Sequence, residues 1–301
     1  MNEYYKKILF IFKAIRRYRI VYKNWVSVIL SVRSLKPTKV IFRKRDDIKY
    51  TISSELAVCA SYYLSEHNGG IKDIADFFEI FSGNFQYKNK KIQIKNIENG
   101  DPMGVFFNEE YKFLNVNNEI VIDIGANIGD SAIYFAIEGA KKVISLEPYP
   151  YSYRISLENI KINQVENKVI LLNAGYGEDK IVKIDENYFN KPSSDLKIIP
   201  NGKNIKLFSL KSLLDEYVVE NNDAVLKVDC EGCEYNILKE TLETIRRFKK
   251  ICIEYHYGYA DLKKKLEESG FTVKITKPDY SYNRWASNPN MYAGYIFAER
   301  N

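Results

Sequence analysis

Glu119-Ile-Val-Ile-Asp-Ile-Gly-Ala-Asn-Ile-Gly-Asp130, continued by Val143-Ile-Ser-Leu-Glu-Pro148, carries the strongest structural signal in the chain. A short apolar run over residues 120–124 ends in a glycine-containing turn, and apolar residues at helical spacing then continue towards Gly139. A second apolar run over residues 143–146 ends in Glu147. This order of strand, glycine loop, helix and strand predicts a parallel βαβ unit in a doubly wound α/β sheet.

The glycine spacing discriminates between nucleoside cofactors. A dinucleotide site uses G-x-G-x-x-G, because the middle glycine lets the backbone approach a pyrophosphate, but Asn127 holds that middle position here. Gly125 and Gly129 therefore predict an open turn for a ligand without phosphates, such as S-adenosylmethionine. We expect Asp123 to accept hydrogen bonds from the ammonium group of that ligand, and Glu147 to bind its ribose.

A third strand, expected over residues 169–172, ends at Asn173. A nucleoside-binding sheet reaches the adenine edge at this place, and an amide can pair there with an amino group and a ring nitrogen. Asn173 is therefore the adenine candidate. Asparagine is also a common turn-forming residue, so this second interpretation stays open.

Acidic residues and a histidine gather after two later strands. The continuous apolar run over residues 224–229 predicts a buried parallel strand, and a neighbouring strand is expected over residues 250–255. Because ligands bind beyond the carboxyl ends of such strands, these side chains should converge on one crevice. The crevice set is Asp229, Glu231, Glu234, Glu254 and His256.

Each member of the crevice set has an expected role. His256 is the first candidate for a general base, with Glu254 or Asp229 orienting it, because histidine exchanges protons near neutral pH. Glu231 and Glu234 are expected on the substrate side of the crevice. Glu234 would equally suit the N-terminus of a helix over residues 233–246.

Five motifs, in their order and spacing, resemble the FkbM-type family of S-adenosylmethionine-dependent methyltransferases. They are Asp123 to Asp130, Glu147-Pro148, Asn159 to Asn163, Lys227 to Glu234 and Ile253 to His256. The resemblance covers about residues 100–298, and the block over residues 227–234 is its most distinctive part. It implies a Rossmann-like class I methyltransferase sheet, mostly parallel with helices on both faces, and an O-methyltransferase acting on a hydroxyl of a sugar, glycan or secondary metabolite.

The chain is expected to divide into an N-terminal α+β cap region, residues 1–100, and an S-adenosylmethionine-binding methyltransferase domain, residues 101–301. Residues 3–35 predict a basic amphipathic helix. Its apolar run is too short to cross a membrane. The helix would either pack against protein or lie on an anionic membrane surface, which predicts a cytoplasmic protein, with the inner membrane surface as the alternative.

Composition narrows the remaining classes. Of the 301 residues, 46% are hydrophobic and 28% charged, which is typical of a globular protein, and the net charge of +6 does not by itself predict nucleic-acid binding. A small-molecule or glycan acceptor is expected instead. Two alternatives from other classes stay open: an NAD(P)-dependent oxidoreductase built on the same βαβ unit, and a non-catalytic membrane-surface scaffold.

Four cysteines at positions 59, 230, 233 and 252 are too few for a disulfide framework, which indicates a reducing compartment. The acids flanking Cys230 and Cys233 argue against a reactive thiol pair. No metal ligands are assigned. Carboxylates of Asp229, Glu231 and Glu254 could nevertheless accept a divalent ion, because hard cations prefer oxygen ligands.

Overall fold

The computed structural model describes residues 3–66, 71–97, 101–185, 196–218, 223–278 and 291–300. The chain forms two compact units, Met1–Asn89 and Lys90–Asn301. This division falls somewhat before the boundary at residue 100 that the sequence predicts. None of the helices in the described ranges combines the length and apolar character needed to cross a membrane.

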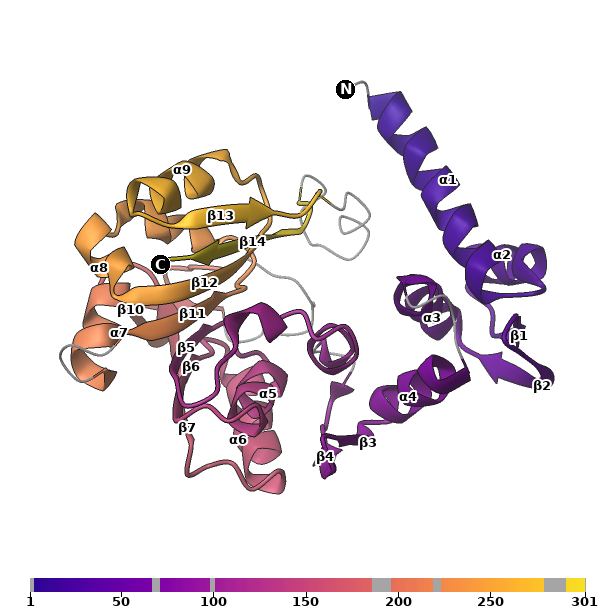
Figure 1. Ribbon diagram of the computed structural model, residues 1–301, viewed down its shortest axis with the longest axis horizontal. Helices are drawn as coiled ribbons and strands as arrows, with labels where there is room; N and C mark the ends of the chain where they lie inside the picture. The colour runs from indigo at the N-terminus through magenta and orange to yellow at the C-terminus, as the bar shows by residue number, and fades with distance from the viewer. Residues whose placement is uncertain are drawn as a thin grey trace. The chain divides into compact units, whose positions relative to one another are not determined.

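The first unit combines helices with strands (Figure 1). Its elements are α1 (Glu3–Val21), α2 (Trp25–Arg33), β1 (Thr38–Phe42), β2 (Arg45–Ile52), α3 (Ser54–Glu66), α4 (Ile71–Phe81) and β3 (Asn84–Tyr87). β1 and β2 form an antiparallel hairpin. Its turn falls at residues 43–44.

The single helix predicted over residues 3–35 is wrong, because the structure has two helices there. Tyr22 leaves the helix to form a β-bridge with Phe42, and its hydroxyl donates to the carbonyl of Ala57 at 2.8 Å. The side chain of Asn24 then bonds to the backbone of Lys39 and of Ile41 in β1. These contacts with the hairpin turn the chain between α1 and α2.

A seven-stranded sheet in the order β13-β14-β12-β11-β5-β6-β7 forms the centre of the second unit (Figure 1). β4 (Lys90–Gln93) precedes it in the chain, and its strands are β5 (Ile120–Ile124), β6 (Lys142–Leu146), β7 (Val169–Leu172), β11 (Ala224–Val228), β12 (Phe248–Tyr255), β13 (Thr272–Ile275) and β14 (Gly294–Glu299). β14 runs antiparallel to both of its neighbours, whereas the other paired strands are parallel. The predicted mostly parallel sheet is confirmed.

Helices cover both faces of this sheet (Figure 1). α5 (Asp130–Ile137) and α6 (Pro150–Ile162) pack together against β5, β6 and β7. α7 (Leu210–Tyr217), α8 (Leu242–Arg246) and α9 (Ala260–Glu268) follow one another on the opposite face. The apolar strands are buried between the two layers, as expected for a parallel sheet.

A small second sheet, ordered β8-β10-β9, forms in the insertion that follows β7. Its strands are β8 (Ala174–Tyr176), β9 (Lys180–Ile184) and β10 (Lys203–Phe208). A separate apolar cluster that includes Ile184, Ile205 and Leu207 stabilises this sheet.

The helix predicted over residues 233–246 is divided in the structure. A 3₁₀ segment, Cys233–Lys239, comes first, and Glu240 then adopts an extended conformation. Thr241 restarts the helix as α8, because its side-chain oxygen accepts a hydrogen bond from the Thr244 N–H. Glu234 therefore begins a short 3₁₀ segment rather than a long helix.

Candidate functional site

The predicted site residues lie along the carboxyl edge of the large sheet. Glu147, Asn173 and Asp229 directly follow β6, β7 and β11, and His256 directly follows β12. Asp123 lies one residue before the end of β5, and Glu254 holds the same position in β12. The topology therefore brings these side chains to one edge.

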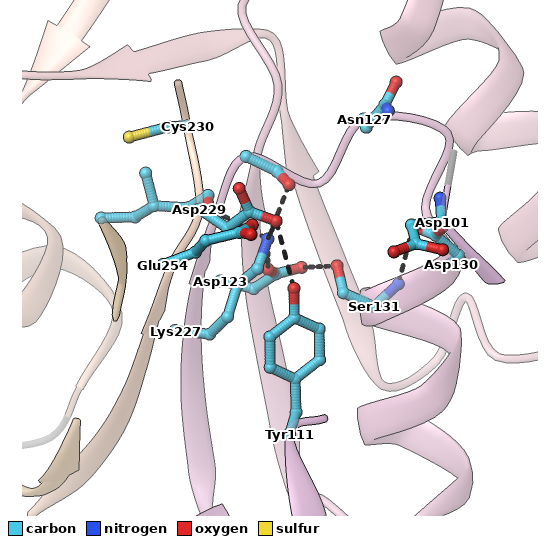
Figure 2. A network of polar contacts seen from close by, with 12 residues as sticks. Asp101, Tyr111, Asp123, Asn127, Asp130, Ser131, Lys227, Asp229, Cys230 and Glu254 are labelled. Carbon is cyan, nitrogen blue, oxygen red and sulfur yellow. Dashed lines mark hydrogen bonds and ion pairs between the residues drawn. The ribbon is translucent and has the colours of Figure 1, made fainter. Parts of the chain in front are cut away.

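A polar row crosses the middle of the sheet just below this edge (Figure 2). The register places Asp123 between Ser145 on β6 and Lys227 on β11. One carboxylate oxygen of Asp123 accepts hydrogen bonds from the hydroxyls of Ser145 and Ser131, both at 2.9 Å, and the other lies 3.2 Å from the Lys227 ammonium. Asp123 has no exposed surface. Lys227 already supplies a cation to Asp123, and the expected contact of Asp123 with the ammonium group of a ligand stays a prediction.

Lys227 links the row to the glycine loop. Its ammonium donates to the carbonyls of Ile124 at 3.1 Å and Gly125 at 2.7 Å. Burial acts to lower the pKa of Lys227, but the Asp123 and Asp229 carboxylates outweigh it and raise the pKa. The sequence analysis missed this role. One sequence signal for this role was available, because Lys227 lies in a strand that is otherwise apolar. A charged side chain buried in such a strand needs a partner.

Backbone conformation and close packing require glycine at both glycine positions of the loop. Both adopt positive φ angles, 83° for Gly125 and 88° for Gly129. A side chain on Gly125 would collide with the carbonyl oxygen of Asp229, and one on Gly129 would lie 2.5 Å from the Ser156 hydroxyl. They therefore allow the loop to pack against the turn after β11 and against α6.

Glu147 fixes the position of the loop from β6. Its carboxylate oxygens accept hydrogen bonds from the backbone N–H groups of Asn127 at 2.9 Å and Tyr149 at 2.8 Å. Burial raises the pKa of Glu147 to about 7, although both N–H groups act in the opposite direction. Each carboxylate oxygen can accept more than one hydrogen bond, so the two oxygens suit the neighbouring hydroxyls of a ribose.

Asn173 serves the chain rather than an open site. Its side-chain nitrogen donates to the carbonyl of Glu147 at 2.9 Å and to that of Pro148 at 3.0 Å. Both amide hydrogens are therefore used to hold the loop after β6. The structure favours the turn-forming interpretation over hydrogen-bond donation to adenine.

His256 is fully buried and held by glutamates. Its Nδ1 lies 3.0 Å from Oε1 of Glu234, and its backbone N–H donates to the same oxygen at 3.0 Å. Its Nε2 lies 3.1 Å from the Glu231 carboxylate and 4.0 Å from that of Glu254. Glu234 thus orients the ring, and the prediction that Glu254 or Asp229 does so is wrong.

The surrounding charges change the protonation of His256. Burial acts to lower the pKa of the imidazole, but the Glu234 hydrogen bond and the carboxylates of Glu231 and Glu234 outweigh it and raise the pKa to about 9. The ring is therefore protonated at neutral pH in the structure without ligand. This environment therefore does not give His256 the ordinary histidine pKa of about 6.5 that suits a base near neutral pH.

The turn that carries these glutamates is tight. Glu231 and Gly232 have φ angles of 57° and 121°, and the Gly232 N–H donates to Glu234 at 2.7 Å. A disulfide joins Cys230 to Cys233, whose Cα atoms are 5.5 Å apart. That these cysteines are not a reactive thiol pair stays a prediction, because the bond does not measure thiol reactivity. The turn that brings the two sulfur atoms together has no local signal in the sequence.

Asp229 and Glu254 face a second group of acids that the sequence analysis missed. The Tyr111 hydroxyl donates to Asp229 at 3.1 Å (Figure 2). Burial, together with the charges of Asp229 and Glu231, raises the pKa of Glu254 well above its usual range. Burial and the charge of Asp101 likewise raise the pKa of Glu110 to about 8. No motif marks Tyr111 or Glu110, because only the fold brings them to the edge.

Asp130, the last residue of the glycine motif, adds another buried acid. Its carboxylate accepts hydrogen bonds from the N–H groups of Asp101 at 2.8 Å and Ser131 at 3.0 Å (Figure 2). Burial, with the charge of Asp101, raises the pKa of Asp130 to about 7. Lys227 and the protonated His256 are cations among these acids, and the remaining carboxylates suit a positively charged ligand such as a sulfonium or ammonium group.

The same donor set bears on metal binding. Asp229, Glu231 and His256 each offer one ligand atom, and these atoms lie within 4.8 Å of one another. A divalent cation could be held there by two carboxylates and an imidazole. The sequence suggested Asp229, Glu231 and Glu254 as ligands for a divalent ion, whereas the group in the structure contains His256 in place of Glu254.

Comparison with known proteins assigns the family. A model of the methyltransferase FkbM domain matches residues 123–273, just over half of the 301 residues. The tRNA(Phe) (4-demethylwyosine(37)-C(7)) aminocarboxypropyltransferase of Pyrococcus horikoshii is 38% identical over 154 residues, which cover 48% of this chain and 46% of that relative. The chain thus spans about half the length of this relative.

Two further similarities are more distant. Methyltransferase sdnD of Sordaria araneosa is 22% identical over 221 residues, covering 60% of this chain and 85% of that protein. The crystal structure of an rRNA methylase from Streptococcus thermophilus is 14% identical with a TM-score of 0.39, covering 64% of this chain and 95% of that one. The family match, together with the strand order and the glycine loop, identifies the chain as a member of the FkbM methyltransferase family.

Proposed function

We propose that this methyltransferase acts on a hydroxyl oxygen of a sugar, glycan or secondary metabolite. The observation that carries the proposal is the His256 and Glu231 pair, 3.1 Å apart at the carboxyl edge of β11 and β12. S-adenosylmethionine supplies an electrophilic methyl group. As the acceptor oxygen bonds to the methyl carbon, the carbon–sulfur bond breaks and the hydroxyl proton must leave. His256, which is fully buried, and Glu231, which is partly exposed, can take that proton at this edge once the imidazole is neutral.

The cofactor contacts follow from the site. Residues 125–129 form the open loop, and Glu147 is proposed to bind the ribose hydroxyls. Asp229 and Glu254 are proposed to face the positively charged part of the cofactor, because their carboxylates lie at the ends of neighbouring strands. Asp123 and Asn173 are proposed to position the loops, since their polar atoms already bond to the chain.

His256 can act as the base only if cofactor binding lowers its pKa from about 9. A cation placed beside Asp229 and Glu254 would do this, because positive charge disfavours the protonated imidazole. The loaded enzyme would then hold a neutral ring with Nδ1 bonded to Glu234 and Nε2 directed towards Glu231. We propose that Nε2 receives the acceptor proton.

The acidic edge also bears on the class of acceptor. The carboxylates of Asp229 and Glu231 would repel the phosphates of a nucleic acid, which supports a neutral acceptor. The tRNA substrate in the name of the Pyrococcus horikoshii relative is therefore not proposed for this chain.

The N-terminal segment is proposed to contact an anionic membrane surface on the cytoplasmic side. Ile11, Phe12 and Leu30 are more than half exposed, and Arg16 and Arg19 are exposed on the same pair of helices. Apolar side chains beside basic ones suit the interface of an anionic bilayer. Cosedimentation with phosphatidylserine vesicles should be lost when Ile11 and Phe12 are both changed to serine. Binding that is equal for the variant and the native chain would refute this contact.

Labelled methyl transfer tests the proposed reaction. The full chain is incubated with S-adenosylmethionine carrying a tritiated methyl group and with separate fractions of glycans, lipids, protein and RNA. We expect label in the glycan or lipid fraction, and we expect it to survive mild alkali because an ether bond is not hydrolysed there. Label found in RNA or protein, or released by alkali as from an ester, would refute O-methylation of a hydroxyl.

A further inference from the structure

A cavity opens beside the candidate site, between the small sheet and the turn after β11. Its volume is about 330 Å³. It is lined by Tyr176, Gly177, Glu178, Lys180, Leu196, Ile198, Leu207, Glu231, Gly232, Cys233, Asn236, Lys239 and Tyr257. The insertion after β7 therefore forms one wall, and the turn that holds the catalytic candidates forms the other.

The cavity and the candidate site share Glu231. This residue lines the cavity, and its carboxylate lies 3.1 Å from Nε2 of His256. The described residues around the cavity include neither the glycine loop over 125–129 nor Glu147. A molecule in the cavity would thus reach Glu231, the carboxylate beside the proposed base, without occupying the proposed cofactor contacts.

The lining combines apolar and polar surfaces. Leu196, Ile198 and Leu207 supply aliphatic side chains, and Tyr257 adds an aromatic ring. Glu178 forms ion pairs with Lys180 at 3.4 Å and Lys239 at 3.1 Å, and all three of these charged side chains are more than half exposed. The cavity therefore has apolar walls and a charged, hydrogen-bonding rim.

A sugar ring matches this lining. One face of a pyranose presents C–H groups that pack on aliphatic or aromatic side chains, and its hydroxyls bond to carboxylate, ammonium and amide groups. The volume is at the lower end of the range for ligand sites, roughly 300 to 1,000 Å³. Such a size suits one or two sugar units rather than a bulky polycyclic molecule.

We propose that this cavity is the acceptor site and that it binds a neutral glycoside of one or two pyranose rings. The inference rests on the proposed O-methyl transfer and adds the location and chemical class of the acceptor. The insertion after β7, which lies outside the distinctive family motifs, then determines acceptor specificity. Ile198 in its wall is the residue to change.

A matched pair of isoleucines makes the test specific. Ile198 is 58% exposed and lines the cavity, whereas Ile181 on β9 is 69% exposed and does not line it. A tryptophan at either position enlarges an exposed side chain, so neither change should unfold the protein. Only Ile198→Trp should fill the cavity.

Binding is measured on the full chain saturated with S-adenosylhomocysteine. Saturation-transfer NMR uses methyl glycosides of glucose, galactose, mannose and rhamnose, each alone, while calorimetry follows S-adenosylhomocysteine itself. We expect at least one glycoside to bind the native chain and Ile181→Trp, and its affinity to fall at least tenfold in Ile198→Trp. S-adenosylhomocysteine should bind all three proteins with affinities within twofold of one another.

Each other outcome overturns a stated part of the reasoning. If S-adenosylhomocysteine binds but no glycoside does, or if Ile198→Trp keeps the glycoside affinity, the acceptor site is wrong while the methyltransferase site stands. Weaker S-adenosylhomocysteine binding in Ile198→Trp alone would make the cavity part of the cofactor site, which also refutes the proposal. Failure of S-adenosylhomocysteine to bind the native chain would instead refute the proposed cofactor contacts.

Discussion

Replacing Lys227 by methionine should strongly destabilise the second unit. Methionine keeps much of the apolar stem but removes the ammonium that donates to the carbonyls of Ile124 and Gly125. It also leaves Asp123, which has no exposed surface, without its cation at 3.2 Å. Loss of one partner of a buried ion pair costs about 3 to 5 kcal/mol. We expect the free energy of unfolding to fall by that amount.

A surface pair provides the matched control. Lys95 and Glu158 are 3.0 Å apart with side chains 57% and 59% exposed, so Lys95→Met should cost no more than about 1 kcal/mol. Combining Lys227→Met with Asp123→Asn should recover part of the loss, because the unpaired charge is gone. The expected coupling energy in this double-mutant cycle is about 0.5 to 3 kcal/mol.

Urea unfolding followed by circular dichroism measures these energies, and hydrogen exchange of the β5 and β11 amides assigns them to the sheet. The reasoning is refuted if Lys227→Met costs less than about 1 kcal/mol, the range of an exposed pair. It is also refuted if the double variant with Asp123→Asn is as unstable as the sum of the two single changes.

Three further changes test other parts of the site. Glu147→Gln should weaken S-adenosylhomocysteine binding by about 1.5 to 3 kcal/mol in calorimetry. Native Glu147 has a folded pKa of about 7, so it keeps its proton in the folded state as pH rises from about 4.5 to 7, and the free energy of unfolding falls across that window. Glu147→Gln should remove this fall. Unchanged S-adenosylhomocysteine affinity in this variant would place the ribose elsewhere. Glu234→Gln should lower the pKa of His256 from about 9, and NMR can follow it readily because the chain has 2 histidines; an unchanged pKa would contradict the assigned hydrogen bond. Loss of the Glu234 carboxylate should also reduce the stability that the raised pKa of His256 contributes. That contribution is present below about pH 6.5 and disappears as pH rises through about 9. Changing Cys230 and Cys233 together to serine should cost roughly 2 kcal/mol, the loop entropy of so short a ring, and a mass shift on alkylating the native protein without reductant would show that the disulfide does not form.

The sequence predicts the sheet well because its strands are local signals. The strands at residues 120–124 and 224–228 are apolar except for Asp123 and Lys227, so both strands and their parallel arrangement could be inferred without any contact information. The glycine loop and Glu147 follow from their spacing within one βαβ unit. These features depend on residues close together in the chain.

The parts that the sequence does not predict depend on distant partners. Asp123 was assigned to a ligand because Lys227, its buried partner, follows about a hundred residues later and meets it only through strand register. Glu234 was expected on the substrate side of the crevice, with a helix terminus as the alternative, but the turn with positive φ angles directs it to His256. Such turns and registers have no periodic signal, so the local pattern alone favoured other roles.

A comparison of His256→Ala with Asp229→Asn, in both S-adenosylhomocysteine binding and methyl-transfer rate, is the decisive test of the proposal that His256 takes the acceptor proton. His256→Ala should leave S-adenosylhomocysteine affinity within about twofold and lower the methyl-transfer rate by roughly 10² to 10⁴, the contribution of a positioned base. Asp229→Asn should weaken the affinity as well as the rate, because its charge acts in the ground state and the transition state. Full turnover in His256→Ala, with the same rise in rate with pH as the native enzyme, would contradict the proposal that His256 takes the acceptor proton.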